Sequence, residues 1–241
     1  MRADPPTTRR GRPAPGAVAT TILDGIDLTL QRGRLSVVAG PSGSGKSTLL
    51  RLCNRLEVPT SGRILLDGRD IASLDPLALR RRAAMVFQRP VVFAGTSLDN
   101  LRVAQPDLTP EDATDALARV GLDAGKLDRQ ADDLSGGEAQ RLCIARSLLT
   151  EPDILLMDEA TSALDVDARA AIEGVTRSLA DRGLTVIWVT HDLEQAERIA
   201  DRLVVVVDGR VVGDDAAAEA VARRSFAGLL AAPTVPTEEA P

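Results

Sequence analysis

The stretch Gly40-Pro41-Ser42-Gly43-Ser44-Gly45-Lys46-Ser47-Thr48 follows a continuous apolar run, Leu35 to Ala39, and precedes a helical pattern. A buried strand, a glycine-rich loop ending in Lys-Ser and then a helix form the phosphate-loop pattern. The glycines allow backbone N–H groups to turn inward around an anion, and the helix N-terminus adds its dipole. The stretch therefore predicts a triphosphate-binding loop (residues 40–48, called the P-loop below) in an α/β fold.

The lysine of this loop stands out chemically. Lys126 is the only other lysine, and arginine supplies all the remaining cations of the chain. A compact ammonium fits a closed loop where a planar guanidinium does not, which argues against a chance glycine turn. We expect Lys46 to reach the β- and γ-phosphates and Ser47 to place its hydroxyl on Mg²⁺.

Outward from the loop, short apolar runs alternate with helical patterns. We predict strands at Ile26–Leu30, Leu35–Ala39, Ile64–Leu66, Ala84–Phe87, Ile154–Met157, Val186–Val189 and Leu203–Val207. We predict helices at Leu49–Leu56, Glu111–Val120, Gly137–Leu149, Ala168–Asp181 and Leu193–Ala200. This alternation indicates a parallel sheet covered on both faces by helices. Residues 91–150 contain helical patterns without a clear strand, so we expect a helical insertion there.

Composition sets the outer limits of the interpretation. A chain of 241 residues with 44% hydrophobic residues is large enough for one sizeable core. The Pro- and Arg-rich residues 1–16 and residues 232–241 are interpreted as disordered tails around one domain, 17–231. The net charge of −6 argues against nucleic acid as a partner. No apolar run is long enough to cross a bilayer, and no signal peptide is apparent, so we expect a cytoplasmic location.

Two further motifs carry polar groups suited to phosphate chemistry. Asp158 and Glu159 end the apolar run that starts at Ile154, where acids can hold a metal and a water or simply lie in a solvated turn. Ser135, Gly136 and Gly137 open a helix, as an anion site or as an ordinary N-cap. Two such helix starts but one acidic strand end suggest a shared site whose halves meet when two chains pair.

These motifs resemble those of the nucleotide-binding subunit of an ATP-binding cassette (ABC) transporter. Gly40–Ser47 is similar to the Walker A motif, Ile154–Glu159 to Walker B and Leu134–Glu138 to the signature motif. Gln88 resembles the Q-loop glutamine, Ser162–Asp165 the D-loop and His191 the switch histidine. The resemblance implies a P-loop NTPase core with a parallel sheet, an antiparallel β portion near the N-terminus and an inserted helical subdomain.

The resemblance also implies a role for each matching residue. The P-loop holds the ATP phosphates, Ser47 and Gln88 ligate Mg²⁺, and Asp158 acts on Mg²⁺ through water. Glu159 polarises the attacking water, and His191 contacts the γ-phosphate. Ser135, Gly136 and Gly137 close over the ATP of the opposite chain, with Asp165 at the interface. The implied partners are a second copy, head to tail with ATP sandwiched between, and integral membrane permease subunits that place the chain at the inner face of the plasma membrane.

The transported solute is the least determined part. Asn54–Glu57, Met85–Pro90 and Ser162 are similar to phosphate-import ATPases, which favours import of a phosphate-type solute. Phe93–Leu101 and Trp188–His191 also resemble small systems thought to export metals such as iron. The motifs leave room, too, for a non-transport cassette ATPase or a regulatory module without turnover. The apolar segment 89–95 after Gln88 is expected to dock a membrane partner, or else to pack on the chain's own helices.

One departure from the family pattern concerns the adenine. The family places an aromatic ring on the base shortly before the first alternating strand, a position that falls near Ala17 here. The chain has no tyrosine, and its phenylalanines are Phe87, Phe93 and Phe226. The usual stacking contact is therefore missing from the sequence.

Overall fold

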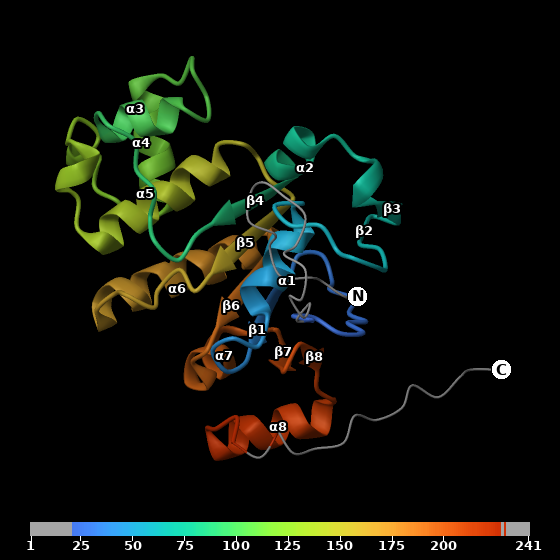
Figure 1. The fold of residues 1–241 in the computed structure, drawn as a ribbon. Helices are drawn as coiled ribbons and strands as arrows, with labels where there is room; N and C mark the ends of the chain where they lie inside the picture. Colours follow the sequence, from blue (N-terminus) through green and yellow to red (C-terminus); the bar gives the residue numbers. More distant parts are fainter. Residues whose placement is uncertain (1–20, 228, 230–241) are drawn as a thin grey trace, which may run out of the picture. The chain divides into compact units, whose positions relative to one another are not determined.

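The computed structural model describes residues 21–227 and 229 (Figure 1). It divides into two compact units. Among the described residues, the first unit comprises 21–30, 36–72, 189–227 and 229, and the second comprises 31–35 and 73–188. The tails predicted at 1–16 and 232–241, and Ala17, lie outside the described residues, and the single domain 17–231 stays a prediction.

The main sheet has six strands in the hydrogen-bonding order β4-β5-β6-β1-β7-β8. These strands are β1 Leu35–Ala39, β4 Ala83–Val86, β5 Ile154–Asp158, β6 Thr185–Thr190, β7 Arg202–Val207 and β8 Arg210–Val211. In the first unit β1 pairs with β7 in parallel, and in the second unit β4 pairs with β5 in parallel. The strands β1 and β6 are buried along their whole length, as expected of a sheet with both faces covered. The predicted α/β class is confirmed.

The α-helices are α1 Lys46–Cys53, α2 Pro76–Arg82, α3 Ser97–Arg102, α4 Pro110–Arg119, α5 Gly136–Leu148, α6 Val166–Asp181, α7 Leu193–Ile199 and α8 Asp214–Arg223. Three short 3₁₀ turns complete the set: η1 Ile71–Ser73, η2 Ala124–Lys126 and η3 Ala131–Asp133. In the second unit, α3 and α4 both pack against α5, and the three form one cluster, green to yellow-green in Figure 1. The helices predicted inside 91–150 are therefore present.

Side-chain caps define where most of these helices begin. The helices α2 to α7 start at Asp75, Thr96, Thr109, Ser135, Asp165 and Asp192, and each of these side chains accepts a backbone N–H of the first turn. The helix α1 differs, because its N-cap is Gly45, which has no side chain to accept such a bond.

Two sequence-based predictions were wrong in a way that the structure explains. Ile26–Leu30 shows the expected alternation of exposure but forms no strand, and the Thr29 carbonyl accepts a bond from the Arg202 side chain instead of a neighbouring strand. An alternating pattern of exposure therefore does not by itself mean that the segment pairs with a neighbouring strand. The first helix begins at Lys46 rather than at Leu49, because the amide of Leu49 already bonds to the Gly45 carbonyl at 2.8 Å. The helices α2, α3 and α8 were not predicted.

Two hairpins of the first unit have turns of the same type. The hairpin of β2 (Leu65–Leu66) and β3 (Arg69–Asp70) turns through Asp67-Gly68, as the sequence predicted, and that of β7 and β8 turns through Asp208-Gly209. All four turn residues have positive φ, between 48° and 76°, the pattern of a type I′ turn. The second turn also supports the P-loop, because the amide of Gly209 donates to the Ser44 carbonyl at 3.2 Å.

These matched turns give a stability prediction. An added Cβ at Gly68 meets nothing within 4 Å, whereas at Gly209 it would lie 2.2 Å from the carbonyl oxygen of Ile22. Gly68→Ala should therefore lose only the left-handed strain, about 1–2 kcal/mol of unfolding free energy. Gly209→Ala should lose ~1–3 kcal/mol more, because backbone must shift. Urea unfolding of both variants without nucleotide measures this; equal losses would contradict it.

Candidate active site

The P-loop closes around its own lysine. The side chain of Lys46 is 4% exposed, and its Nζ donates to the carbonyl oxygens of Gly40 at 2.9 Å and Pro41 at 2.8 Å. The loop is tightened further by the amide of Ser44, which donates to the Pro41 carbonyl at 3.2 Å. An ammonium ion is thus held inside a turn of backbone, as the choice of lysine over arginine suggested.

Each of three loop glycines is required for a different physical reason. A Cβ at Gly40 would lie 2.1 Å from the Val206 carbonyl oxygen, so the loop touches β7 directly. Gly43 has φ of 81° with open space around it, so its conformation rather than crowding favours glycine. Gly45 has φ of 96°, and its Cβ would lie 3.1 Å from the Ile22 carbonyl oxygen.

Two local observations indicate that the loop is suited to bind an anion such as a triphosphate. The hydroxyl of Ser44 is buried and has no hydrogen-bond partner in the described part of the chain. The adjoining helix α1 starts without a side-chain cap. A buried hydroxyl and an uncapped helix N-terminus are the groups that an anion satisfies, by accepting their hydrogen bonds and by the helix dipole.

In the second unit, the structure brings Gln88 and Glu159 together. Gln88 follows β4 and Glu159 follows the neighbouring strand β5. The Nε2 of Gln88 donates to Glu159 Oε2 at 3.3 Å and to Ser162 Oγ at 3.0 Å. Glu159 also has a φ of 46°, which is uncommon for a residue with a side chain and is a form of local strain found at active sites. Asp158, which precedes it, is buried.

The signature residues form the capped start of α5. Ser135 Oγ accepts from the Glu138 amide at 3.3 Å, and Glu138 Oε2 accepts from the Ser135 amide at 2.9 Å, a reciprocal capping box. The N-cap interpretation of Ser135 is therefore confirmed, while its phosphate contact stays a prediction. Ser135 and Gly136 are exposed, and Gly137 is buried against Ala168 of α6. Asp165 caps α6 by accepting from the Ala168 amide at 2.8 Å.

The remaining predicted residues are divided between the units. His191 is exposed and lies between β6 and α7 in the first unit, which also contains the P-loop. Gln88, Asp158, Glu159, Ser135–Gly137 and Asp165 belong to the second unit. The predicted Mg²⁺ donors, Ser47, Gln88 and Asp158, all offer oxygen atoms, the ligand type that Mg²⁺ prefers.

Sequence reasoning missed two sets of contacts from α5. Gln140 is 1% exposed, and its Nε2 donates to the carbonyl of Phe87, the residue before Gln88, at 3.0 Å. Farther along α5, Arg146 donates to the Val91 carbonyl at 2.7 Å, and its guanidinium lies 4.7 Å from the centre of the Phe93 ring. No sequence signal distinguishes these residues, because each position fits an ordinary helix face.

The backbone of the apolar segment 89–95 is bound to the chain's own helices, as one of its two sequence-based interpretations expected, and docking of a membrane partner stays a prediction. Its backbone is fixed to the chain's own helices by Arg146 of α5 and by Asn100 of α3, whose side chain bonds to both the amide and the carbonyl of Phe93. The side chains of Val91 and Phe93 nevertheless remain 52% and 45% exposed. A rigid backbone with exposed apolar side chains is a surface suited to a partner.

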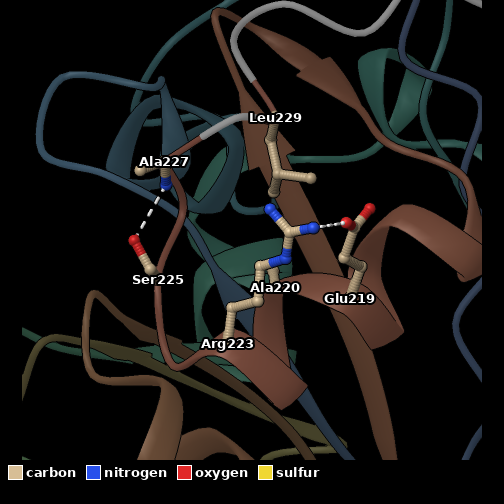
Figure 2. A pocket seen from close by; sticks show the side chains of 6 residues that line it. All are labelled: Glu219, Ala220, Arg223, Ser225, Ala227 and Leu229. Atoms are coloured by element: carbon tan, nitrogen blue, oxygen red, sulfur yellow. Dashed lines mark hydrogen bonds and ion pairs between the residues drawn. The ribbon is translucent and has the colours of Figure 1, made fainter.

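A hollow in the first unit is lined by none of the predicted site residues. Arg223 and Glu219 pair at 2.6 Å beside it, and Figure 2 marks this ion pair by a dashed line. Its volume is about 50 Å³, and its lining residues are Glu219, Ala220, Arg223, Ser225, Ala227 and Leu229. Ligand pockets are several times larger, so this hollow is not a candidate site.

Among the described residues, no helix is long and apolar enough to cross a membrane.

With this geometry established, comparison with known proteins decides the family. The family model described as "ABC transporter" matches residues 23–162. The chain belongs to the ABC transporter family. The matched region is an ATP-hydrolysing domain of this family.

Three curated relatives show the range of the family. Protein STAR1 of Oryza sativa subsp. japonica is 47% identical over 197 residues, covering 79% of this chain and 57% of that protein. The mycobactin import ATP-binding/permease protein IrtB of Mycolicibacterium thermoresistibile is 45% identical over 213 residues, covering 83% of this chain but 36% of its own length. The phosphate import ATP-binding protein PstB 2 of Natronomonas pharaonis is 41% identical over 215 residues, covering 82% and 75%.

Two solved structures share the fold with a TM-score of 0.74. One is cbiO1 from Clostridium perfringens, part of the ABC transporter complex cbiONQ, at 30% identity over 81% of this chain and 82% of that one. The other is the ATP-binding cassette MJ0796, described as a dimeric post-hydrolysis state bound to ADP and Pi, at 29% identity over 88% and 94%. The predicted P-loop NTPase core is thus confirmed.

The signature glycines give a prediction that separates packing from function. A Cβ at Gly137 would lie 2.7 Å from the Cβ of Ala168, whereas at Gly136 the nearest atom is a Leu164 methyl at 3.5 Å. Gly137→Ala should therefore cost about 1–3 kcal/mol of unfolding free energy, and Gly136→Ala less than ~0.5 kcal/mol. Urea unfolding tests both, and a comparable loss at Gly136 would contradict the prediction.

Proposed function

We propose that this chain is the ATP-binding and ATP-hydrolysing subunit of a transporter whose membrane-spanning permease subunits are separate proteins. Two copies pair head to tail and share two ATP sites. The observation that carries the proposal is the P-loop itself, with its buried Lys46, its unsatisfied Ser44 hydroxyl and the uncapped start of α1. These groups are arranged for the phosphates of a nucleotide, whatever solute the complex moves.

The P-loop binds and orients the triphosphate. Lys46 exchanges its bonds to the Gly40 and Pro41 carbonyls for contacts with β- and γ-phosphate oxygens, while Ser44 and the first turn of α1 donate to the same anion. Mg²⁺, held by Ser47 and Gln88 and through water by Asp158, would neutralise part of the phosphate charge. His191 contacts the γ-phosphate and so senses whether it is present.

Glu159 orients the water that attacks the γ-phosphorus, and the bond from that phosphorus to the ADP oxygen breaks. The Nε2 of Gln88 holds the Glu159 carboxylate in place before the substrate arrives. Gln88 would also be one of the residues that hold Mg²⁺, through its amide oxygen. Glutamate suits this role because a positioned base contributes typically 10²–10⁴-fold to rate.

The shared site explains the exposed signature residues. Ser135 and Gly136 are open to solvent at the start of α5, where they would meet the γ-phosphate of ATP held by the second copy. Asp165, exposed at the start of α6, would face the same interface. The similar structure of MJ0796, a dimeric post-hydrolysis state bound to ADP and Pi, supports such an arrangement.

The exposed side chains of Val91 and Phe93 form the proposed docking surface for a permease subunit. Arg146 and Asn100 bind the backbone of this segment by hydrogen bonds. A displacement of α5 would therefore displace the segment as well. The cbiO1 relative belongs to a transporter complex, which supports a membrane partner for this chain.

The solute is proposed to be a small anion of the phosphate type, taken up into the cell. Its support is the 41% identity with a phosphate import ATPase, together with the serine at position 162 that bonds to Gln88. Cells lacking this chain should take up labelled phosphate more slowly, and the wild-type chain but not its Glu159→Gln variant should restore uptake. Normal phosphate uptake combined with a defect for another solute would overturn the phosphate assignment alone.

The central prediction concerns Glu159. Glu159→Gln should leave ATP binding intact, lower hydrolysis by about 10²–10⁴-fold and accumulate an ATP-bound dimer. Steady-state phosphate release and size-exclusion chromatography with MgATP measure the two effects.

The chain offers a matched control for this substitution. Glu151→Gln changes another glutamate with nearly the same left-handed backbone, φ 49° against 46°, in the exposed turn before β5. It should hydrolyse ATP at the wild-type rate. Wild-type ATPase activity in both variants would remove Glu159 from the mechanism. The same loss of ATPase activity in both variants would assign the effect to backbone strain.

A further inference from the structure

Glu138 places a negative charge in the first turn of α5. Its carboxylate belongs to the capping box with Ser135, which stabilises the helix start. The same helix start, under the proposed function, must accept a γ-phosphate from the second copy. A carboxylate this close to an incoming phosphate repels it, because like charges oppose each other even when water partly screens them. The two roles of the helix start therefore conflict.

Lys126 lies where it resolves this conflict. Its Nζ is 2.7 Å from Glu138 Oε1, while the other carboxylate oxygen accepts from the Ser135 amide at 2.9 Å. Both side chains are more than two-thirds buried, so solvent screens the pair less than a surface pair. Lys126 is the last residue of η2, in a chain whose other cations, Lys46 apart, are arginines.

The charge state of Glu138 and its surroundings support this interpretation. The hydrogen bond from the Lys126 ammonium, followed by that from the Ser135 amide, lowers the pKa of Glu138 to about 2. Glu138 is thus fully ionised at neutral pH. Asp132 and Asp133, which lie just before Ser135 in η3, add further negative charge along residues 131–138, a stretch without a cation of its own.

We propose that Lys126 is a charge-balancing positioning residue, which cancels the charge of Glu138 so that Ser135, Gly136 and Gly137 can accept the γ-phosphate of ATP held by a second copy. The inference rests on the proposed function. Lys126 does not touch the nucleotide; it acts through Glu138, whose carboxylate it neutralises and directs toward the Ser135 amide. The helix start then keeps the favourable potential of its unpaired N–H groups.

A purely structural role for Lys126 would be to tie η2 to α5. The two roles predict different effects of the Glu138→Gln substitution. Glu138→Gln keeps the capping box, because glutamine serves at this position as well as glutamate, but it removes the negative charge. A structural tie predicts that Glu138→Gln and Lys126→Ala are equally harmful, since both break the same ion pair. Charge balance predicts that only Lys126→Ala is harmful.

The test uses the full chain carrying Glu159→Gln, so that the ATP-bound dimer accumulates. The MgATP concentration for half-maximal dimer formation is measured by analytical ultracentrifugation for this parent and for Lys126→Ala, Glu138→Gln, the double variant and Lys126→Arg. Melting temperatures without nucleotide show whether any variant is merely unfolded.

Lys126→Ala should raise the required MgATP by about 3–10-fold, and this penalty should shrink in roughly 0.5 M salt because the charges are then screened. Glu138→Gln and Lys126→Arg should match the parent or need less MgATP, and the double variant should return to within about twofold of it.

Three outcomes would contradict the charge-balancing role while leaving the shared ATP site intact. These are a Glu138→Gln variant that dimerises more weakly than the parent, a double variant no better than Lys126→Ala, and a Lys126→Ala variant that forms dimers as readily as the parent. A parent that stays monomeric at saturating MgATP, although nucleotide binds, overturns the proposed dimer and the inference together.

Discussion

The closeness of the P-loop backbone to β7 is the constraint on which the first unit depends. The Cα of Gly40 approaches the Val206 carbonyl so nearly that no side chain fits between them, and the Gly209 amide holds the Ser44 carbonyl from the β7–β8 turn. Because β7 is also the parallel partner of β1, the strand that leads into the loop, the start of the loop is held against β7 and its middle against the turn that follows β7. These contacts support the loop shape in which Lys46 bonds to the Gly40 and Pro41 carbonyls.

The second unit is organised by α5. Its first turn is the signature motif, its middle carries Gln140 against the Phe87 carbonyl, and its last turn carries Arg146 against Val91 and Phe93. One rigid helix thus touches the proposed ATP contact, the residue before Gln88 and the proposed docking surface. Under the proposed function, such a helix would carry a small displacement at its N-terminus to the segment 87–93, since packed elements move as bodies rather than deforming continuously.

The relatives show why the ATPase geometry does not reveal the solute. Similar chains are described as phosphate import and mycobactin import proteins, two very different solutes. The residues of the candidate site are proposed to bind phosphates, metal and a second copy, and none of these contacts involves the solute. Specificity for the solute must reside in surfaces that touch it, and the exposed Val91 and Phe93 are proposed to contact a membrane partner instead.

The sequence by itself determined the P-loop, the Asp67-Gly68 turn, the burial of β1 and β6 and the order of the motifs. These depend on local properties: glycine conformations, the helix dipole and hydrophobic runs, all of which are written in adjacent residues. The strand predicted at Ile26–Leu30 failed because pairing requires a partner, and the Thr29 carbonyl found the Arg202 side chain instead. Only the tertiary structure decided the hydrogen bond between Gln88 and Glu159, 71 residues apart, and the one between Gln140 and Phe87, 53 residues apart. It alone paired Lys126 with Glu138 as well, because which ends and helix faces meet is decided by the packing of whole elements and not by any property of the residues taken one at a time.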